Sequence, residues 1–161
     1  MSTTTAILAS YRHPRSTVLA QRDSGAGEER ALAWLMAACL LSFVARLPGL
    51  AREAHLSGGE PPLEALASGA FVGHVLAAPL FLYGLAAVSH LVMKVFGAQG
   101  RFLDARLALF WALLAICPVV LLQGLVVGFI GPGPALTLVS AIAFLGFLFI
   151  WINGLIALEK N

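Results

Sequence analysis

The feature that most constrains this chain is an uncharged run from Leu107 to Phe129. As a helix, these roughly 23 residues would rise about 35 Å, enough to cross a hydrocarbon core about 30 Å thick. The composition agrees, because 60% of the residues are hydrophobic and only 11% are charged. Soluble domains carry about 25% charged residues. The run therefore predicts a membrane-spanning helix.

Three further apolar stretches, residues 31–47, 63–96 and 135–158, extend this prediction to an all-α bundle of about four membrane-spanning helices. The first stretch is short for a span and is followed by an expected polar loop from Pro48 to Pro62. The second would exceed about 45 Å as one helix, so it must tilt, kink at Pro79 or begin outside the membrane. We expect a cytoplasmic N-terminal arm at residues 1–30 and a transmembrane domain at residues 31–158.

The N-terminal arm alternates apolar residues with Arg12, Arg15 and Arg22 and is interrupted at Pro14. This pattern fits a broken amphipathic element that lies on the lipid headgroups. It fits a disordered tail equally well.

Basic residues predict the orientation, because loops rich in Lys and Arg stay in the cytoplasm. Only Arg46 and Arg52 fall on the side of the first predicted loop. Eight basic residues fall on the opposite side: Arg12, Arg15, Arg22, Arg30, Lys94, Arg101, Arg106 and Lys160. Both termini are therefore expected in the cytoplasm. The formal net charge of +2 is too small to indicate a nucleic-acid partner.

Small residues recur four positions apart in two of the predicted helices, a spacing that lets membrane helices approach closely. Gly69, Gly73 and Ala77 form one such stripe, and Gly124 and Gly128 form another. We expect both stripes to pack against other helices.

Two prolines, Pro79 and Pro118, lie inside apolar segments. Each removes one helical hydrogen bond and predicts a kink. A fixed kink for packing is the favoured interpretation, and a hinge or a binding site at broken backbone is the alternative.

Two histidines, His74 and His90, are the candidate ligand residues. On one helix they would differ by about 160° around the axis and about 24 Å along it, so they cannot share a metal ion. No other predicted span contains a histidine to complete a haem site. The sequence also lacks the motifs of known catalytic sites. We therefore predict no catalytic residue, no metal and no cofactor.

The segment Gly97-Ala-Gln-Gly100-Arg-Phe102, followed by Arg106-Leu-Ala-Leu and the mid-helix Pro118, resembles the central signature of the Ypt-interacting-protein (YIP) membrane family. Tyr11-Arg-His-Pro14-Arg is also similar to the lead-in before the first span of that family, and the short bacterial members are the nearest in form. The resemblance implies a multi-pass protein of the bacterial inner membrane. The family usually has five spans, whereas hydropathy here supports four.

The resemblance implies no reaction. Eukaryotic relatives bind small GTPases through longer N-terminal regions, so that activity is not expected of this chain. The first functional hypothesis is a non-enzymatic bundle that organises the membrane or binds other membrane proteins, including a second copy of itself. The alternatives are a small transporter or channel subunit, and an accessory or cofactor-binding subunit of an energy-transducing complex.

The charge bias gives a testable topology. Reporter fusions at residue 20, in the loop at residues 57–60, near Gln99 and at Asn161 are expected to report inside, outside, inside and inside. An outside reading at Asn161 would indicate an odd number of spans and contradict the four-span topology.

Overall fold

The computed structural model describes residues 3–159, so Met1, Ser2, Lys160 and Asn161 of the predictions above lie outside this range. The described residues contain helices and no strand. In chain order the helices are α1 (Thr3–Ser10), α2 (Pro14–Asp23), α3 (Glu28–Leu56), α4 (Leu63–Phe71), η1 (Val72–Ala77), α5 (Ala78–Val95), α6 (Phe102–Phe129) and α7 (Pro134–Glu159).

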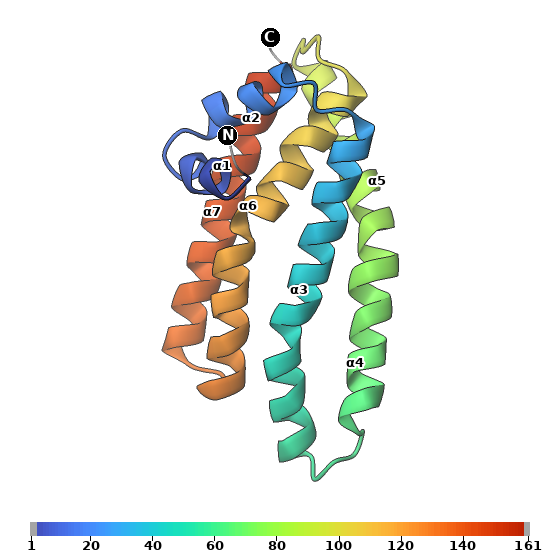
Figure 1. Ribbon diagram of the computed structural model, residues 1–161, viewed down its shortest axis with the longest axis vertical. Helices are drawn as coiled ribbons and strands as arrows, with labels where there is room; N and C mark the ends of the chain where they lie inside the picture. Colours follow the sequence, from blue (N-terminus) through green and yellow to red (C-terminus); the bar gives the residue numbers. More distant parts are fainter. Residues whose placement is uncertain (1–2, 160–161) are drawn as a thin grey trace.

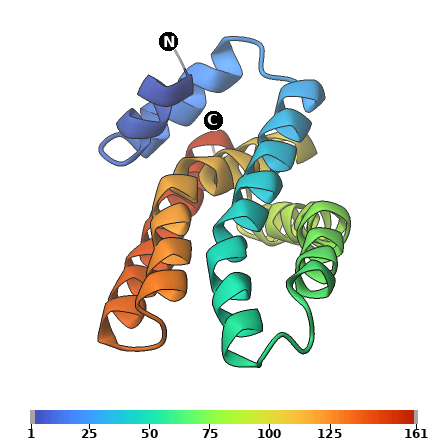
Figure 2. The same cartoon turned by 60° about the horizontal axis from the view of Figure 1, so that its bottom comes forward.

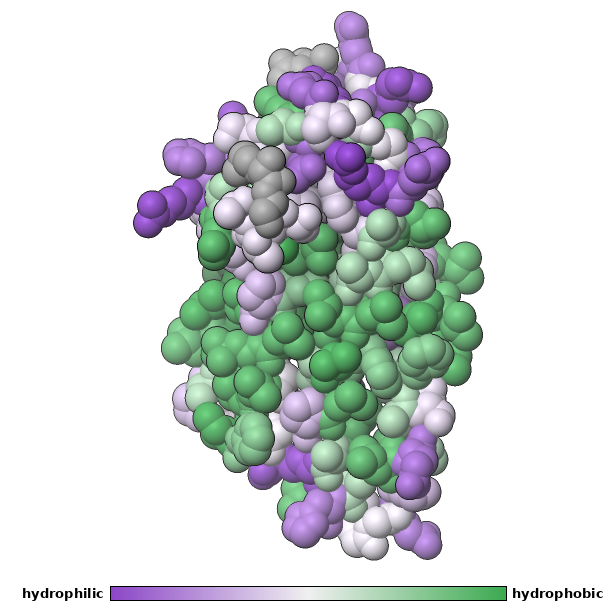
Figure 3. Space-filling view, viewed as in Figure 1, coloured by the Kyte–Doolittle hydropathy of each residue, from purple (hydrophilic) through white to green (hydrophobic). Residues whose placement is uncertain are grey.

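Within residues 3–159, four helical rods are long and apolar enough to cross a membrane: α3, the continuous rod α4–η1–α5, α6 and α7. The predicted all-α bundle with four spans is confirmed. The chain is a multi-pass membrane protein. Figure 3 agrees, because its visible face has an apolar middle zone between hydrophilic ends.

The four rods form two hairpins that lie side by side (Figures 1 and 2). One hairpin joins α3 to α4, and the other joins α6 to α7. Both hairpin turns lie at one end of the bundle, which we call the hairpin end. The N-terminal helices and the end of α7 lie toward the opposite end, which we call the arm end (Figure 1).

The core of the bundle is the first half of α6. This segment contains an unbroken buried run at residues 107–112, with Phe110 and Trp111 at most 1% exposed. Trp111 packs edge-on against Trp34 of α3, with ring centroids 4.9 Å apart. Phe110 packs in the same way against Tyr83 of α5 at 5.1 Å. The uncharged run that predicted a span therefore also supplies the side chains on which the other helices pack.

The first span differs from the prediction. The segment from Pro48 to Leu56, expected in a polar loop, continues α3, and the loop begins only at Ser57. A proline inside a helix removes one hydrogen bond, but membrane helices tolerate it where a neighbouring helix supports the backbone. Pro48 has this support, because it lies against Gly128 of α6.

The second span is continuous but changes helix type. Residues 72–77 form a π-helix immediately before the first turn of α5, which contains Pro79. Pro79 has no N–H to donate to the carbonyl of Val75, and its ring crowds that turn, so the wider π turn accommodates the chain. At Pro79, where a kink was predicted, the rod is continuous and the local departure from the α-helix is a π-helix. Pro118 lies inside α6, which changes direction about midway along its length (Figure 1).

The second small-residue stripe lies in the closest helix contact of the bundle. A Cβ atom on Gly124 would collide with the carbonyl group of Ala45, and one on Gly128 would collide with Pro48. Both neighbours belong to α3. The absence of side chains at these two positions therefore lets the backbones of α3 and α6 touch, as the spacing predicted.

The contact at Gly124 can be tested by adding one methyl group. Gly124→Ala is expected to lower the free energy of unfolding by about 1–3 kcal/mol, because the new Cβ must displace backbone of α3. Gly84→Ala is the matched control, since a Cβ on Gly84 meets nothing within 4 Å. Unfolding by SDS in mixed micelles measures both. Equal stabilities of the two variants would contradict the contact.

Candidate functional site

The first small-residue stripe does not pack inside the chain, so its predicted role in the bundle is wrong. Gly69, Gly73 and Ala77 are all exposed, and a Cβ on either glycine would meet nothing within 4 Å. The second span contacts α3 through its other side, where Phe71 meets Phe43 at 5.5 Å between ring centroids. The stripe therefore faces outward from the bundle.

The part of the second span that carries this stripe is poorly enclosed by the rest of the bundle. No residue of α4 or η1 is buried. In contrast, α5 buries Ala86, Ser89 and His90 near the arm end. The hairpin-end half of this rod thus has a free face of small residues, which we call the outer face: Ala65, Gly69, Gly73 and Ala77.

His90 forms a buried hydrogen bond with an acidic side chain near the arm end. Its Nδ1 donates to Glu159 Oε1 at 2.7 Å, and both side chains are at most 1% exposed. The ring of His90 also lies 4.1 Å from that of Phe102, measured between centroids. Within the described residues, His90 Nε2 and Glu159 Oε2 have no hydrogen-bond partner. The environment of His90 is therefore a protein carboxylate and a phenyl ring.

The loop between α5 and α6 also contacts Glu159. The backbone N–H groups of Gln99 and Gly100 both donate to the Glu159 carbonyl at 3.1 Å. A Cβ on Gly100 would collide with Glu159, so glycine is required at this position. Sequence reasoning missed Glu159, whose burial depends on residues about sixty positions earlier. The segment that suggested the YIP resemblance thus fastens the end of α7 to α5.

The N-terminal arm is helical and packs on the bundle. Trp111 Nε1 donates to Ser10 Oγ at 2.9 Å, and Arg15 Nε donates to Asn153 Oδ1 at 3.0 Å. The Tyr11 hydroxyl donates to the Ala115 carbonyl at 2.7 Å, near the turn that Pro118 disturbs. Burial raises the pKa of Tyr11 above its usual value, which keeps this donor protonated. Of the two sequence interpretations of the arm, the structure supports an ordered helical element.

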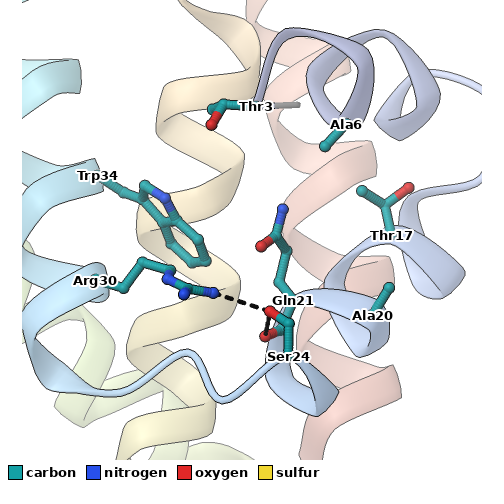
Figure 4. A pocket seen from close by; sticks show the side chains of 8 residues that line it. All are labelled: Thr3, Ala6, Thr17, Ala20, Gln21, Ser24, Arg30 and Trp34. Atoms are coloured by element: carbon teal, nitrogen blue, oxygen red, sulfur yellow. Dashed lines mark hydrogen bonds between the residues drawn. The ribbon is translucent and has the colours of Figure 1, made fainter. Parts of the chain in front are cut away.

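A polar pocket of about 500 Å³ lies between the arm and α3. Figure 4 shows Arg30 and Trp34 of α3 facing Gln21 and Ser24 of α2 across it. Arg30 Nη1 donates to Ser24 Oγ at 2.9 Å. This hydrogen bond joins α2 to the start of α3, so the pocket belongs to the docking of the arm.

His74 lies apart from His90, as the helical spacing predicted. It belongs to η1, and its Nδ1 donates to the Ala70 carbonyl at 3.0 Å in the tautomer that this contact requires. The residue lines a cavity together with Arg46 and Gln123. Within residues 3–159, no three His, Cys, Asp or Glu side chains are placed to hold one metal ion.

No protein-family model matches the chain, and searches of curated proteins and of solved structures return no significant match. The resemblance to the YIP family therefore rests on the sequence motifs alone.

The buried hydrogen bond between His90 and Glu159 gives a stability prediction. Glu159→Ala removes the only polar partner of His90 in the described chain and leaves a buried donor unsatisfied, so it is expected to cost about 1–3 kcal/mol of unfolding free energy. Glu64→Ala, at an exposed acidic position, should cost less than about 0.5 kcal/mol. SDS unfolding of the two variants checks this difference, and an unchanged stability for Glu159→Ala would show that the pair does not fasten α7.

Proposed function

We propose that this protein is a non-enzymatic, YIP-like membrane bundle that binds another membrane protein through the outer face of its second span. The observation that carries the proposal is that Gly69 and Gly73 are exposed and have no neighbour within 4 Å of a Cβ position. The chain uses the same spacing at Gly124 and Gly128 for helix contact. The outer face is therefore a second surface of the same type that its own bundle leaves free.

The physical argument starts from lipid as the solvent. Apolar side chains gain nothing by leaving lipid for another apolar helix, so close van der Waals contact must hold membrane helices together. Large side chains on a lipid-facing surface keep helix axes apart, whereas glycine leaves a shallow depression for an approaching backbone. Gly69 and Gly73 supply such a depression along α4 and η1. The occupant that fits it is a transmembrane helix of a partner.

The π-helix at the same level supports this assignment. Residues 72–77 include Gly73 and Ala77 of the outer face. Single π turns occur frequently at functional sites, because they displace the positions of side chains and leave backbone groups weakly paired. The outer face therefore combines small side chains with an irregular backbone.

The test separates association from folding. Gly73→Leu is expected to reduce copurification of the partner in mild detergent at least about tenfold, because the leucine fills the depression. It should leave the stability of the monomer unchanged, since a Cβ on Gly73 meets none of residues 3–159 within 4 Å. Tagged chain purified from native membranes, followed by quantitative mass spectrometry, measures the copurified protein.

Gly84→Leu is the matched control for this experiment. Gly84 lies on the same rod, is exposed and has no neighbour within 4 Å of a Cβ position, but it is eleven residues beyond Gly73. Its copurified partner should stay near the wild-type amount. Light scattering of the same samples shows whether the partner is a second copy of this chain. Equal copurification by wild type and Gly73→Leu would overturn the proposal.

A further inference from the structure

A second feature, independent of the outer face, is a cavity of about 290 Å³ between α3, η1 and α6. One part of its lining is apolar and includes Val120 and Val127. The other part carries four polar side chains: Ser42, Arg46, His74 and Gln123. All of these residues belong to membrane-spanning rods. A polar cavity inside a span is costly in lipid unless something satisfies its polar groups.

Arg46 is the charge that requires a partner. Within residues 3–159 it forms no hydrogen bond and no ion pair, and the three salt bridges there join other residues. Arginine in a membrane helix almost always pairs with another group or faces water, because an unpaired guanidinium in hydrocarbon is unfavourable. The lining of this cavity contains no acidic side chain. The side chain of Arg46 is exposed, so it is open to an anion from outside the chain.

The depth of Arg46 points to the source of this anion. A Cβ on Gly131, in the turn of the α6–α7 hairpin, would touch the guanidinium of Arg52, so that turn is level with Arg52. Arg46 precedes Arg52 by six residues, which is about 9 Å along α3. Headgroup regions are about 5–8 Å thick on each side of the hydrocarbon core. A long arginine side chain at this depth reaches the headgroup boundary by snorkelling.

The neighbouring polar groups add hydrogen-bonding capacity around Arg46. His74 uses its Nδ1 hydrogen for the Ala70 carbonyl, which leaves Nε2 as an acceptor for a headgroup hydroxyl. Gln123 donates one amide hydrogen to Ser140 Oγ at 2.8 Å, which leaves the second amide hydrogen available. The guanidinium of Arg46 and the Gln123 amide therefore suit an oxyanion that accepts several hydrogen bonds, as a phosphate does.

We propose that this cavity binds the phosphate group of a membrane phospholipid, with Arg46 as its principal ligand. The apolar part of the lining favours a lipid over a free ion, because Val120 and Val127 can contact the glycerol and the first acyl carbons. The volume of the cavity accommodates a headgroup phosphate and is too small for a protein helix, whose diameter is about 10 Å.

The main experiment compares lipid retention by arginine variants. Native mass spectrometry of the detergent-purified protein, with phosphatidylglycerol added, should show one retained lipid on wild type. Arg46→Gln should weaken this binding about tenfold or more, because a charged hydrogen-bond donor is lost. Arg46→Lys keeps the charge without the planar fork and should fall between the two.

Arg52→Gln is the matched control, since Arg52 lies on the same helix but touches the α6–α7 turn instead of the cavity. It should retain lipid like wild type. Thermal unfolding without added lipid should be unchanged for Arg46→Gln, because Arg46 makes no polar contact with any other residue of the described range 3–159. Equal lipid retention by wild type and Arg46→Gln would overturn the proposal, as would an equal loss in Arg52→Gln.

Two further probes identify the chemistry that is recognised. A phosphate-free glycolipid with the same acyl chains should raise the melting temperature of wild type less than phosphatidylglycerol does. Inorganic phosphate alone should give no shift at millimolar concentration. An equal shift with the glycolipid would overturn the phosphate assignment, and saturation by inorganic phosphate would replace the lipid with a free anion as the ligand.

Discussion

The bundle depends on the contact between α3 and α6, where two helix backbones touch because the glycines at the contact have no side chain. In lipid, no hydrophobic effect draws helices together, so the number of close atom contacts decides which helices associate. Gly124 and Gly128 provide these contacts because they lack the side-chain atoms that would hold the two helix axes apart. The ion pair between Arg106 and Glu28 adds a contact between the same two helices at the arm end. The other elements then pack on the α3–α6 pair.

Two consequences follow for the rest of the molecule. The arm packs on α6 through hydrogen bonds with Trp111 and Ala115, and α7 is joined to α6 by the hydrogen bond from Gln123 to Ser140. The second span contacts the bundle mainly along α3 and near His90, which leaves its hairpin-end half enclosed on one side only. A bundle built in this way has one firmly packed pair of helices and a second span whose hairpin-end half has a free surface. Both the proposed partner contact and the phosphate cavity involve that rod.

The fold class was predictable because it follows from the length and hydropathy of the apolar stretches, which are local properties of the sequence. The uncharged run from Leu107 to Phe129 forms most of α6, and the other apolar stretches form the remaining spans. Helix boundaries were less predictable. The prolines and glycines between residues 48 and 62 indicated one long loop, but Pro48 is supported by α6 and stays helical. Such support comes from tertiary packing, so it cannot be recognised from the residues next to Pro48 in the sequence.

The site residues show the same division between local and tertiary information. The spacing of Gly69 and Gly73 is identical to that of Gly124 and Gly128, yet only the second pair packs inside the chain. A four-residue period shows that a helix face is smooth, but not which helix meets it. Glu159 and Arg46 likewise have no local signal that marks their surroundings. Their surroundings are created by His90, Gly100 and His74, which are distant in sequence.

The most direct test of the α3–α6 contact is a disulfide between Gly49→Cys and Val127→Cys, made in a chain with Cys39→Ala and Cys117→Ala. A Cβ on Gly49 would lie 3.7 Å from Val127 Cβ. Disulfides form at Cβ separations of about 3.5–4.5 Å. We expect nearly complete cross-linking in native membranes under mild oxidation, and none for Gly73→Cys with Val127→Cys. Failure of the first pair to cross-link, or equal cross-linking of both pairs, would contradict the claim that the bundle is built on the contact between α3 and α6.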